Sequence, residues 1–349
     1  MTDQGSNPAD FKLFVYHQTS TGTLDTPVTV SYSSLSGEGT ETTGWRRRTA
    51  IGSKDLNADG VPDLVVGVRG GFAVVYGQKQ RNYVARRVSN VMGTSGDSFV
   101  FLDADRDGNM DIASQNQSSG DPRWGTTVFF GDQAGTFDRQ IFIPTSDDGN
   151  IELRGGDLNS DGITDLAVAF GQGLAQRVEV RYGNGSGGFS DKVTVPAPAD
   201  IIRGLTTIAV GDFSGSDGKD DLVAAGTDQN FTGGTFWIFK QLGNALSPSA
   251  VKLPSLAPKD TSHTPDTSLA TDLNGDGKTD FLVQRSGGSL SYFEQKNGEL
   301  STEQNYAGPY ATWGGLTPIA VGDLNRDGCR DVAMANYNAG LVVWLGRGC

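Results

Sequence analysis

A nine-residue stretch rich in side-chain oxygens is repeated along the chain. Its first copy, DLNADGVPD at residues 55–63, carries carboxylate or amide oxygens at positions 1, 3, 5 and 9 and a glycine at position 6. Calcium takes about six to eight hard oxygen ligands, and known calcium loops present them at alternate positions around a glycine turn. A backbone carbonyl at position 7 would complete such a set. The stretch therefore predicts a calcium-binding loop.

The stretch occurs six times, about 54 residues apart on average, which is the period of a repeat architecture. The fourth copy, DFSGSDGKDD, has one inserted residue and Ser214 in place of asparagine. A single copy could be an ordinary Asp/Asn/Gly turn, but six copies at one period favour metal binding. The predicted ligands, with the position-7 residue acting through its carbonyl, are Asp55, Asn57, Asp59, Val61 and Asp63; Asp103, Asp105, Asp107, Asn109 and Asp111; Asp157, Asn159, Asp161, Ile163 and Asp165; Asp212, Ser214, Asp217 and Asp221; Asp272, Asn274, Asp276, Lys278 and Asp280; and Asp323, Asn325, Asp327, Cys329 and Asp331.

Short apolar runs on both sides of each loop predict the strands that must position it. In the first complete repeat we expect strands at 49–56, 64–68, 72–76 and 83–88, and no segment of the chain shows a sustained helical period. Four short antiparallel strands per repeat predict a β-propeller blade. An aromatic residue is expected at one common position near the end of each third strand, packed between blades: Tyr16, Tyr76, Phe130, Tyr182, Phe239 and Phe293.

The order strand, DxNxDGxxD loop, strand, then a Gly-Asn-Gly-like turn and Phe resembles the FG-GAP/VCBS repeat of integrin α-subunit propellers and many secreted bacterial proteins. The resemblance covers nearly the whole chain from Phe11. It implies an all-β propeller that holds structural Ca²⁺ at up to six sites. We expect residues 1–10 to be a flexible leader and residues 11–349 to form one propeller domain of four-stranded antiparallel blades.

The strand count favours six blades, with seven as the alternative. Residues 11–18 look like the third strand of a blade without the two strands that should precede it, and the last repeat ends after its third strand. We therefore expect an N-terminal strand to join the last blade and close the ring.

The overall composition narrows the classes of partner. The formal charge is −13 at pH 7, and no basic stripe is present, which argues against a nucleic-acid partner. No apolar run is long enough to enter a membrane, and no signal peptide is recognisable. Cys329 and Cys349 are predicted to form a disulfide, with two free thiols as the alternative. A disulfide and calcium sites both favour a secreted or cell-surface protein.

Aromatic and arginine side chains gather in the loops expected at the face opposite the calcium loops. In a four-stranded meander the first and third turns lie at one face, and the second turn and the connection to the next blade lie at the other. Loop aromatics beside arginine suit stacking on a sugar ring or clamping a peptide. The alternative is that the tryptophans cap the gap between blades. The predicted ligand-binding residues are Trp45, Arg47, Arg123, Trp124, Phe231, Trp313 and Tyr337.

The resulting functional prediction is a lectin-like carbohydrate-binding module. GWRRR before the first loop resembles a segment of a fungal propeller lectin. The alternatives are a protein-adhesion module of the integrin type, with an extracellular protein as partner, and a non-catalytic scaffold domain. We do not expect an enzyme, because the chain has only His17 and His263 and lacks the motifs GxSxG, HExxH and the P-loop. A glycosidase using a carboxylate such as Asp147 or Asp148 is the alternative to that expectation.

Overall fold

The structure is a computed structural model of the 349-residue chain. The residues whose structure is described are 2–3, 12–31, 51–68, 71–89, 95–117, 124–145, 150–171, 176–201, 204–227, 234–256, 264–310, 319–336 and 338–349.

The described residues form antiparallel β-sheets, and their one helical segment is the 3₁₀ turn at Lys79–Arg81. None of these residues belongs to a helix that is long and apolar enough to span a membrane. The chain divides into two compact units, Met1–Asp148 and Gly149–Cys349, which are described separately. The predicted all-β class is confirmed.

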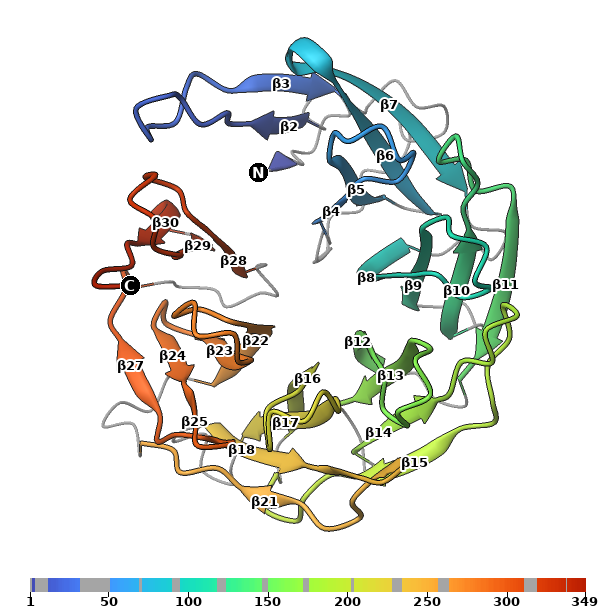
Figure 1. Ribbon diagram of the computed structural model, residues 1–349, viewed down its shortest axis with the longest axis vertical. Coiled ribbons are helices and arrows are strands. Elements are labelled where there is room, and N and C mark those ends of the chain that lie inside the picture. Colours follow the sequence, from blue (N-terminus) through green and yellow to red (C-terminus); the bar gives the residue numbers. More distant parts are fainter. Residues whose placement is uncertain are drawn as a thin grey trace. The chain divides into compact units, whose positions relative to one another are not determined.

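Unit 1 contains two four-stranded meanders that each carry one predicted calcium loop (Figure 1). The predicted strands of the first repeat are confirmed to within a few residues. The strands of the first meander are β4 (Ile51–Lys54), β5 (Asp63–Val68), β6 (Gly71–Gln78) and β7 (Asn82–Ser89), and those of the second are β8 (Ser95–Leu102), β9 (Asp111–Gln117), β10 (Gly125–Phe130) and β11 (Arg139–Pro144).

The N-terminal strands of unit 1 form a third sheet, which lacks the calcium-loop motif. Its strands are β1 (Thr2–Asp3), β2 (Lys12–Val15) and β3 (Val28–Ser31), hydrogen-bonded in that order. Leu13 and Val30 of this sheet pack on Val66 and Ala73 of the first meander. The pairing that we expected between an N-terminal strand and the last blade concerns both units and stays a prediction.

Unit 2 contains the remaining four sheets with a calcium loop, three of them four-stranded and the last three-stranded. Their first strands pack beside one another in succession, as the inner strands of propeller blades do. With the two of unit 1 they make six motif-bearing blades, which confirms the preferred count. The strands are β12 (Asn150–Gly156), β13 (Asp165–Phe170), β14 (Arg177–Arg181) and β15 (Val193–Pro196); β16 (Gly204–Gly211), β17 (Asp221–Thr227), β18 (Gly234–Phe239) and β21 (Val251–Lys252); β22 (Pro265–Thr271), β23 (Asp280–Arg285), β24 (Leu290–Phe293) and β27 (Gln304–Tyr306); and β28 (Ile319–Gly322), β29 (Asp331–Asn336) and β30 (Gly340–Trp344).

Two short hairpins extend the turns after the third strands of the fourth and fifth blades. Their strands are β19 (Gln241–Leu242) with β20 (Ala245–Leu246), and β25 (Gln295–Lys296) with β26 (Glu299–Leu300).

The hydrophobic core lies between successive blades, because each second strand is covered on both sides. Every residue of β13 and β17 is buried, which explains why these strands read as continuous apolar runs rather than as alternating ones. Between the fourth and fifth blades, Phe236 lies edge-on to Phe293 and Phe281, with ring centroids 5.0 and 6.1 Å apart. Such packing fixes the spacing of neighbouring calcium loops.

The register corrects one sequence-based expectation. The strand pairings place Leu64 opposite Val75, which precedes Tyr76, whereas Leu222 lies opposite Phe239 and Phe281 opposite Phe293. The aromatic residues therefore occupy two neighbouring positions rather than one. Tyr16, with 42% of its surface exposed, does not share the buried environment of Phe239 and Phe293.

Candidate metal centres

All six predicted calcium loops connect the first and second strands of a blade in the same register. The residue before each loop pairs with the aspartate that ends it, as Gly156 pairs with Asp165. The glycine at position 6 has a φ between 77° and 89° in every copy, a region that favours glycine. The residue at position 4 is also left-handed, even where it is Ala58 or Ser160, with φ of 55° and 60°. These two reversals curl each loop around its own side-chain oxygens.

The third loop shows how those oxygens are held. The carboxylate of Asp157 accepts hydrogen bonds from the N–H groups of Asp161 (3.1 Å) and Gly162 (2.8 Å). The side-chain oxygen of Asn159 accepts from the N–H of Asp161 (2.9 Å), and Asp161 accepts from the N–H of Ile163 (2.8 Å). Oxygens at positions 1, 3 and 5 are thus fixed on the inner side of the loop.

The aspartate at the end of each loop has a second role that the sequence did not reveal. Asp165 is fully buried, and its Oδ2 accepts from the N–H of Leu158 (2.8 Å) while its Oδ1 accepts from the N–H of Gly183 (2.9 Å), just past the third strand. It therefore ties the loop to the body of the blade. The residues held in the same way, at or just past the end of the third strand, are Gly77, Gly131, Gly183, Gln241, Gln295 and Gly346. Because a carboxylate offers about four lone-pair sites, this role leaves room for a metal.

Burial disfavours the ionised form of several of these aspartates when no cation is bound. It raises the pKa of Asp111 to about 6 and that of Asp165 to about 7, opposed by their backbone hydrogen bonds. Burial also raises the pKa of Asp63, Asp221 and Asp280. A divalent cation at the loop would favour the ionised form of each.

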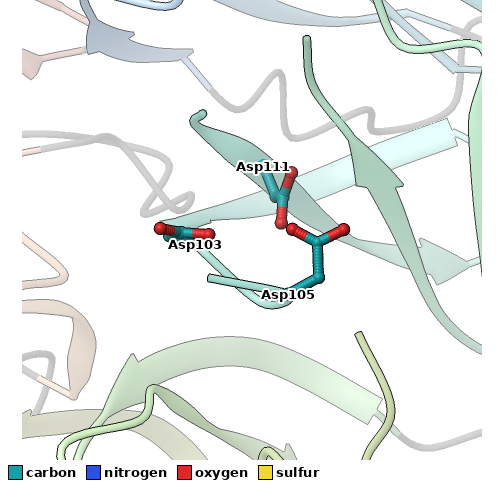
Figure 2. A group of neighbouring side chains, drawn as sticks. All are labelled: Asp103, Asp105 and Asp111. Carbon is teal, nitrogen blue, oxygen red and sulfur yellow. The ribbon is translucent and has the colours of Figure 1, made fainter. Parts of the chain in front are cut away.

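In the second loop, three carboxylates lie close enough together to bind one cation. One oxygen each from Asp103, Asp105 and Asp111 lies within 4.8 Å of the others (Figure 2). Ligands at about 2.3–2.6 Å from one Ca²⁺ lie within about 5 Å of each other, so the spacing fits. One oxygen of Asp105 bonds Arg139, and its Oδ1 is buried without a hydrogen-bond partner. A cation would satisfy that orphaned oxygen.

The fourth loop accommodates its extra residue and keeps two orphaned oxygens. Asp212 accepts from the N–H of Gly218 (2.8 Å) through Oδ2, while its Oδ1 is buried without a partner, as is Oδ2 of Asp221. Asp220, at position 8 of this loop, has a role that the sequence-based prediction missed. Asp220 accepts from the N–H of Asp157 (2.8 Å), the first residue of the third loop. The most divergent copy therefore fits a cation and also supports its neighbour.

Two glutamines connect neighbouring loops. Gln241 Nε2 donates to Ser160 Oγ of the third loop (3.0 Å). Gln295 Nε2 donates to the carbonyl of Asp212 in the fourth loop (2.8 Å). Both occupy the position near the end of the third strand where the other four blades have glycine. This difference between blades was visible in the sequence and could have indicated a special role for the two glutamines.

The predicted disulfide between Cys329 and Cys349 is confirmed, with Cα atoms 5.4 Å apart. Because the disulfide involves only the side chain of Cys329, the backbone carbonyl of this residue remains available as the predicted metal ligand at position 7.

The predicted ligand-binding group falls mostly outside the described residues. Trp124 is described: it is half-buried at the start of β10, and its carbonyl accepts from the N–H of Thr145 (2.9 Å). His17 contacts the hydroxyl of Tyr83 at 2.9 Å. The predicted ligand-binding residues outside the described part of the chain are Trp45, Arg47, Arg123, Phe231, Trp313 and Tyr337, so the group stays a prediction. Asp147, Asp148 and His263 also lie outside it.

Comparison with known proteins decides the family of these blades. Residues 272–348, which span the fifth and sixth loops, match the family model of the FG-GAP-like repeat. The chain is a β-propeller that carries an FG-GAP-like repeat. This propeller matches no curated protein sequence.

Among solved structures, the FG-GAP-repeat propeller is similar to a lectin of Agrocybe aegerita that recognises non-reducing terminal N-acetylglucosamine. The TM-score is 0.59 at 16% identity, over 90% of this chain and 80% of the lectin. It is also similar to part of the Photorhabdus luminescens Tc holotoxin pore (TM-score 0.49, 17% identity, 99% of this chain and 15% of that one) and to the Dos1 propeller (TM-score 0.49, 12% identity, 84% and 65%). At 16% identity the likeness to the lectin shows the fold alone.

Proposed function

We propose that this FG-GAP-repeat propeller is a calcium-stabilised, non-catalytic module that binds carbohydrate outside the cell. The proposal of calcium binding rests on the buried Oδ1 of Asp105, which has no hydrogen-bond partner and lies beside Asp103 and Asp111. When bound, Ca²⁺ would neutralise the loop carboxylates and cross-link positions 1, 3 and 5 to the buried aspartate at position 9. The likeness to the N-acetylglucosamine-recognising lectin over 90% of the chain supports the carbohydrate part.

The disulfide supports an extracellular setting, because such bonds persist in oxidising compartments. Extracellular calcium is also abundant enough to fill loop sites of moderate affinity. Binding rather than catalysis is supported by the loop carboxylates themselves, since they are engaged in holding backbone N–H groups such as those of Gly162 and Leu158.

A protein-adhesion role is the second candidate. It is favoured by aliphatic side chains on and just after β30: Leu341, Val343 and Leu345 have 44%, 36% and 52% of their surfaces exposed. Apolar surface of this kind suits a protein partner better than a sugar.

A glycan array probed with the intact protein, in calcium and in excess EDTA, tests the proposal. We expect binding to a defined set of glycans, weaker in EDTA, and a lower thermal midpoint in EDTA. We also expect Trp124→Ala to reduce array binding without shifting the midpoint. Capture of an extracellular protein with no glycan bound would favour adhesion instead. Calcium binding is contradicted if the midpoint is the same in both buffers and metal analysis finds none.

A further inference from the structure

A cavity of about 440 Å³ lies within unit 2, between the outer strands of the fifth and sixth blades. Its floor consists of the buried side chains of Leu290, Tyr292 and Val332, which are 2%, 7% and 3% exposed. The volume is ordinary for a small-ligand site, where an apolar lining is combined with a few polar groups. The sequence did not reveal it, because its walls come from several separate segments spread over residues 273–349.

Two partly exposed aromatic rings, those of Tyr306 and Trp344, line the cavity. Tyr306 on β27 is 44% exposed, and its hydroxyl donates to Gln304 Oε1 (3.1 Å). Trp344 on β30 donates its indole N–H to the carbonyl of Ala307 (3.3 Å). These bonds give the polar atom of each side chain a partner, and both aromatic rings line the cavity. Such surfaces suit the apolar face of a sugar ring.

The rim carries two guanidinium groups, from Arg330 and Arg347. Arg330 approaches Asp272 at 3.4 Å, and Arg347 forms no ion pair within the described residues. Two arginines beside an aromatic pocket stand out in a chain with a formal charge of −13. Guanidinium groups bind carboxylates through paired hydrogen bonds.

The segment that carries Arg347 is anchored on both sides. The N–H of Gly346 donates to Asp331 Oδ1 (2.8 Å), and Cys349 is bonded to Cys329. Arg347 therefore extends from a short tethered loop, which lowers the entropy lost when it engages a ligand.

We propose that this cavity binds a pyranose that carries a carboxylate, such as a uronic or sialic acid within a glycan. The sugar ring packs against Tyr306 and Trp344, and the carboxylate forms hydrogen bonds with Arg347 and Arg330. An acidic peptide side chain would satisfy the arginines but offers no ring to cover the aromatic walls. The inference rests on the proposed carbohydrate-binding function and adds a site separate from the loop that contains Trp124.

Calorimetric titration of the intact protein with methyl β-glucuronide, N-acetylneuraminic acid and neutral methyl β-glucoside tests the site. We expect at least one acidic sugar to bind about tenfold or more tightly than the glucoside, since loss of a guanidinium–carboxylate pair is worth that factor. Arg347→Gln should remove this preference, whereas Lys79→Gln, which removes an exposed cation of unit 1, should not. Tyr306→Ala should weaken binding, whereas Tyr310→Ala, 62% exposed and not part of the cavity wall, should not.

The outcomes separate this inference from the function on which it rests. Acidic sugars that bind no better than the glucoside, or that bind the Arg347 and Tyr306 variants as they bind the parent, overturn the site. If neutral glycans still bind on the array in that case, the carbohydrate-binding function stands without this cavity. If no glycan of any kind binds, both proposals fail. Thermal melts of every variant check that a loss of binding is not a loss of folding.

Discussion

Asp165→Ala and Asp161→Ala separate the two roles that each loop combines. Asp165 is fully buried and accepts the N–H groups of Leu158 and Gly183, whereas Asp161 is an exposed predicted calcium ligand. The first substitution should therefore destabilise the protein with or without calcium. The second should destabilise it only when calcium is present.

The magnitude follows from the hydrogen bonds. Replacing Asp165 leaves two buried N–H groups without acceptors, at about 1–3 kcal/mol each. The loss is partly offset because a buried carboxylate with a raised pKa is also removed. We therefore expect a net loss of about 2–3 kcal/mol, or roughly 5–10 °C in the thermal midpoint of a unit of this size.

For Asp161→Ala we expect a change within about 0.5 kcal/mol in EDTA, as for most surface substitutions. In calcium at about a hundred times the dissociation constant, losing that one site should remove about 2.7 kcal/mol by mass action.

The assay is a calorimetric melt of the parent and both variants in EDTA and in calcium, with metal analysis of the calcium samples. An Asp165→Ala variant that melts like the parent in EDTA would falsify the structural role of the buried aspartate. An Asp161→Ala variant that loses equal stability in both buffers, and keeps its metal count, would refute the calcium role of the third loop.

Three further perturbations test other parts of the structure. Cys329→Ser should lower the free energy of unfolding by about 3 kcal/mol, measured by denaturant titration, because the disulfide closes a loop with a sequence separation of 20; no change between oxidised and reduced parent would contradict this. In EDTA the thermal midpoint should fall as the pH rises from 5 to 8, since the raised folded-state pKa values of Asp111 and Asp165 give stability that is present at low pH and is lost through pH 6–7. In calcium, which needs the ionised carboxylates, this fall should shrink, and equal slopes in both buffers would count against metal at these loops. Glu303→Leu should cost about 3–5 kcal/mol by chemical denaturation, because Arg285, only 2% exposed, loses the carboxylate that it contacts at 2.5 Å; the double variant with Arg285→Met should recover part of the loss, and a single variant as stable as the parent would show that the pair is not needed.

The conformation of the six loops was predictable because it is determined locally. A glycine at position 6 and oxygens at alternate positions define the turn within nine residues, and the repeat excludes coincidence. The same local pattern assigned Asp165 to the metal alone. Its second partner, the N–H of Gly183, lies beyond the third strand and becomes visible only when that strand is paired.

Features that depend on register or on distant segments were not predictable. The aromatic position was misaligned by one residue in the fourth and fifth blades, since the sequence does not show which residue of the third strand faces Leu222 or Phe281. The cavity between Tyr306 and Trp344 depends on how two blades pack against each other. The Cys329–Cys349 pairing was inferred correctly, because no other cysteines compete.

The links between loops have a direction. Gln241 and Asp220 of the fourth blade hold the third loop, and Gln295 of the fifth blade holds the fourth loop. In unit 1, a glycine of the second blade, Gly135, lies against the first loop. In each case the later blade supports the earlier loop. A chain synthesised from its N-terminus therefore completes each of these loops only after the next blade has folded, so that any metal the loops bind would be captured one blade behind translation.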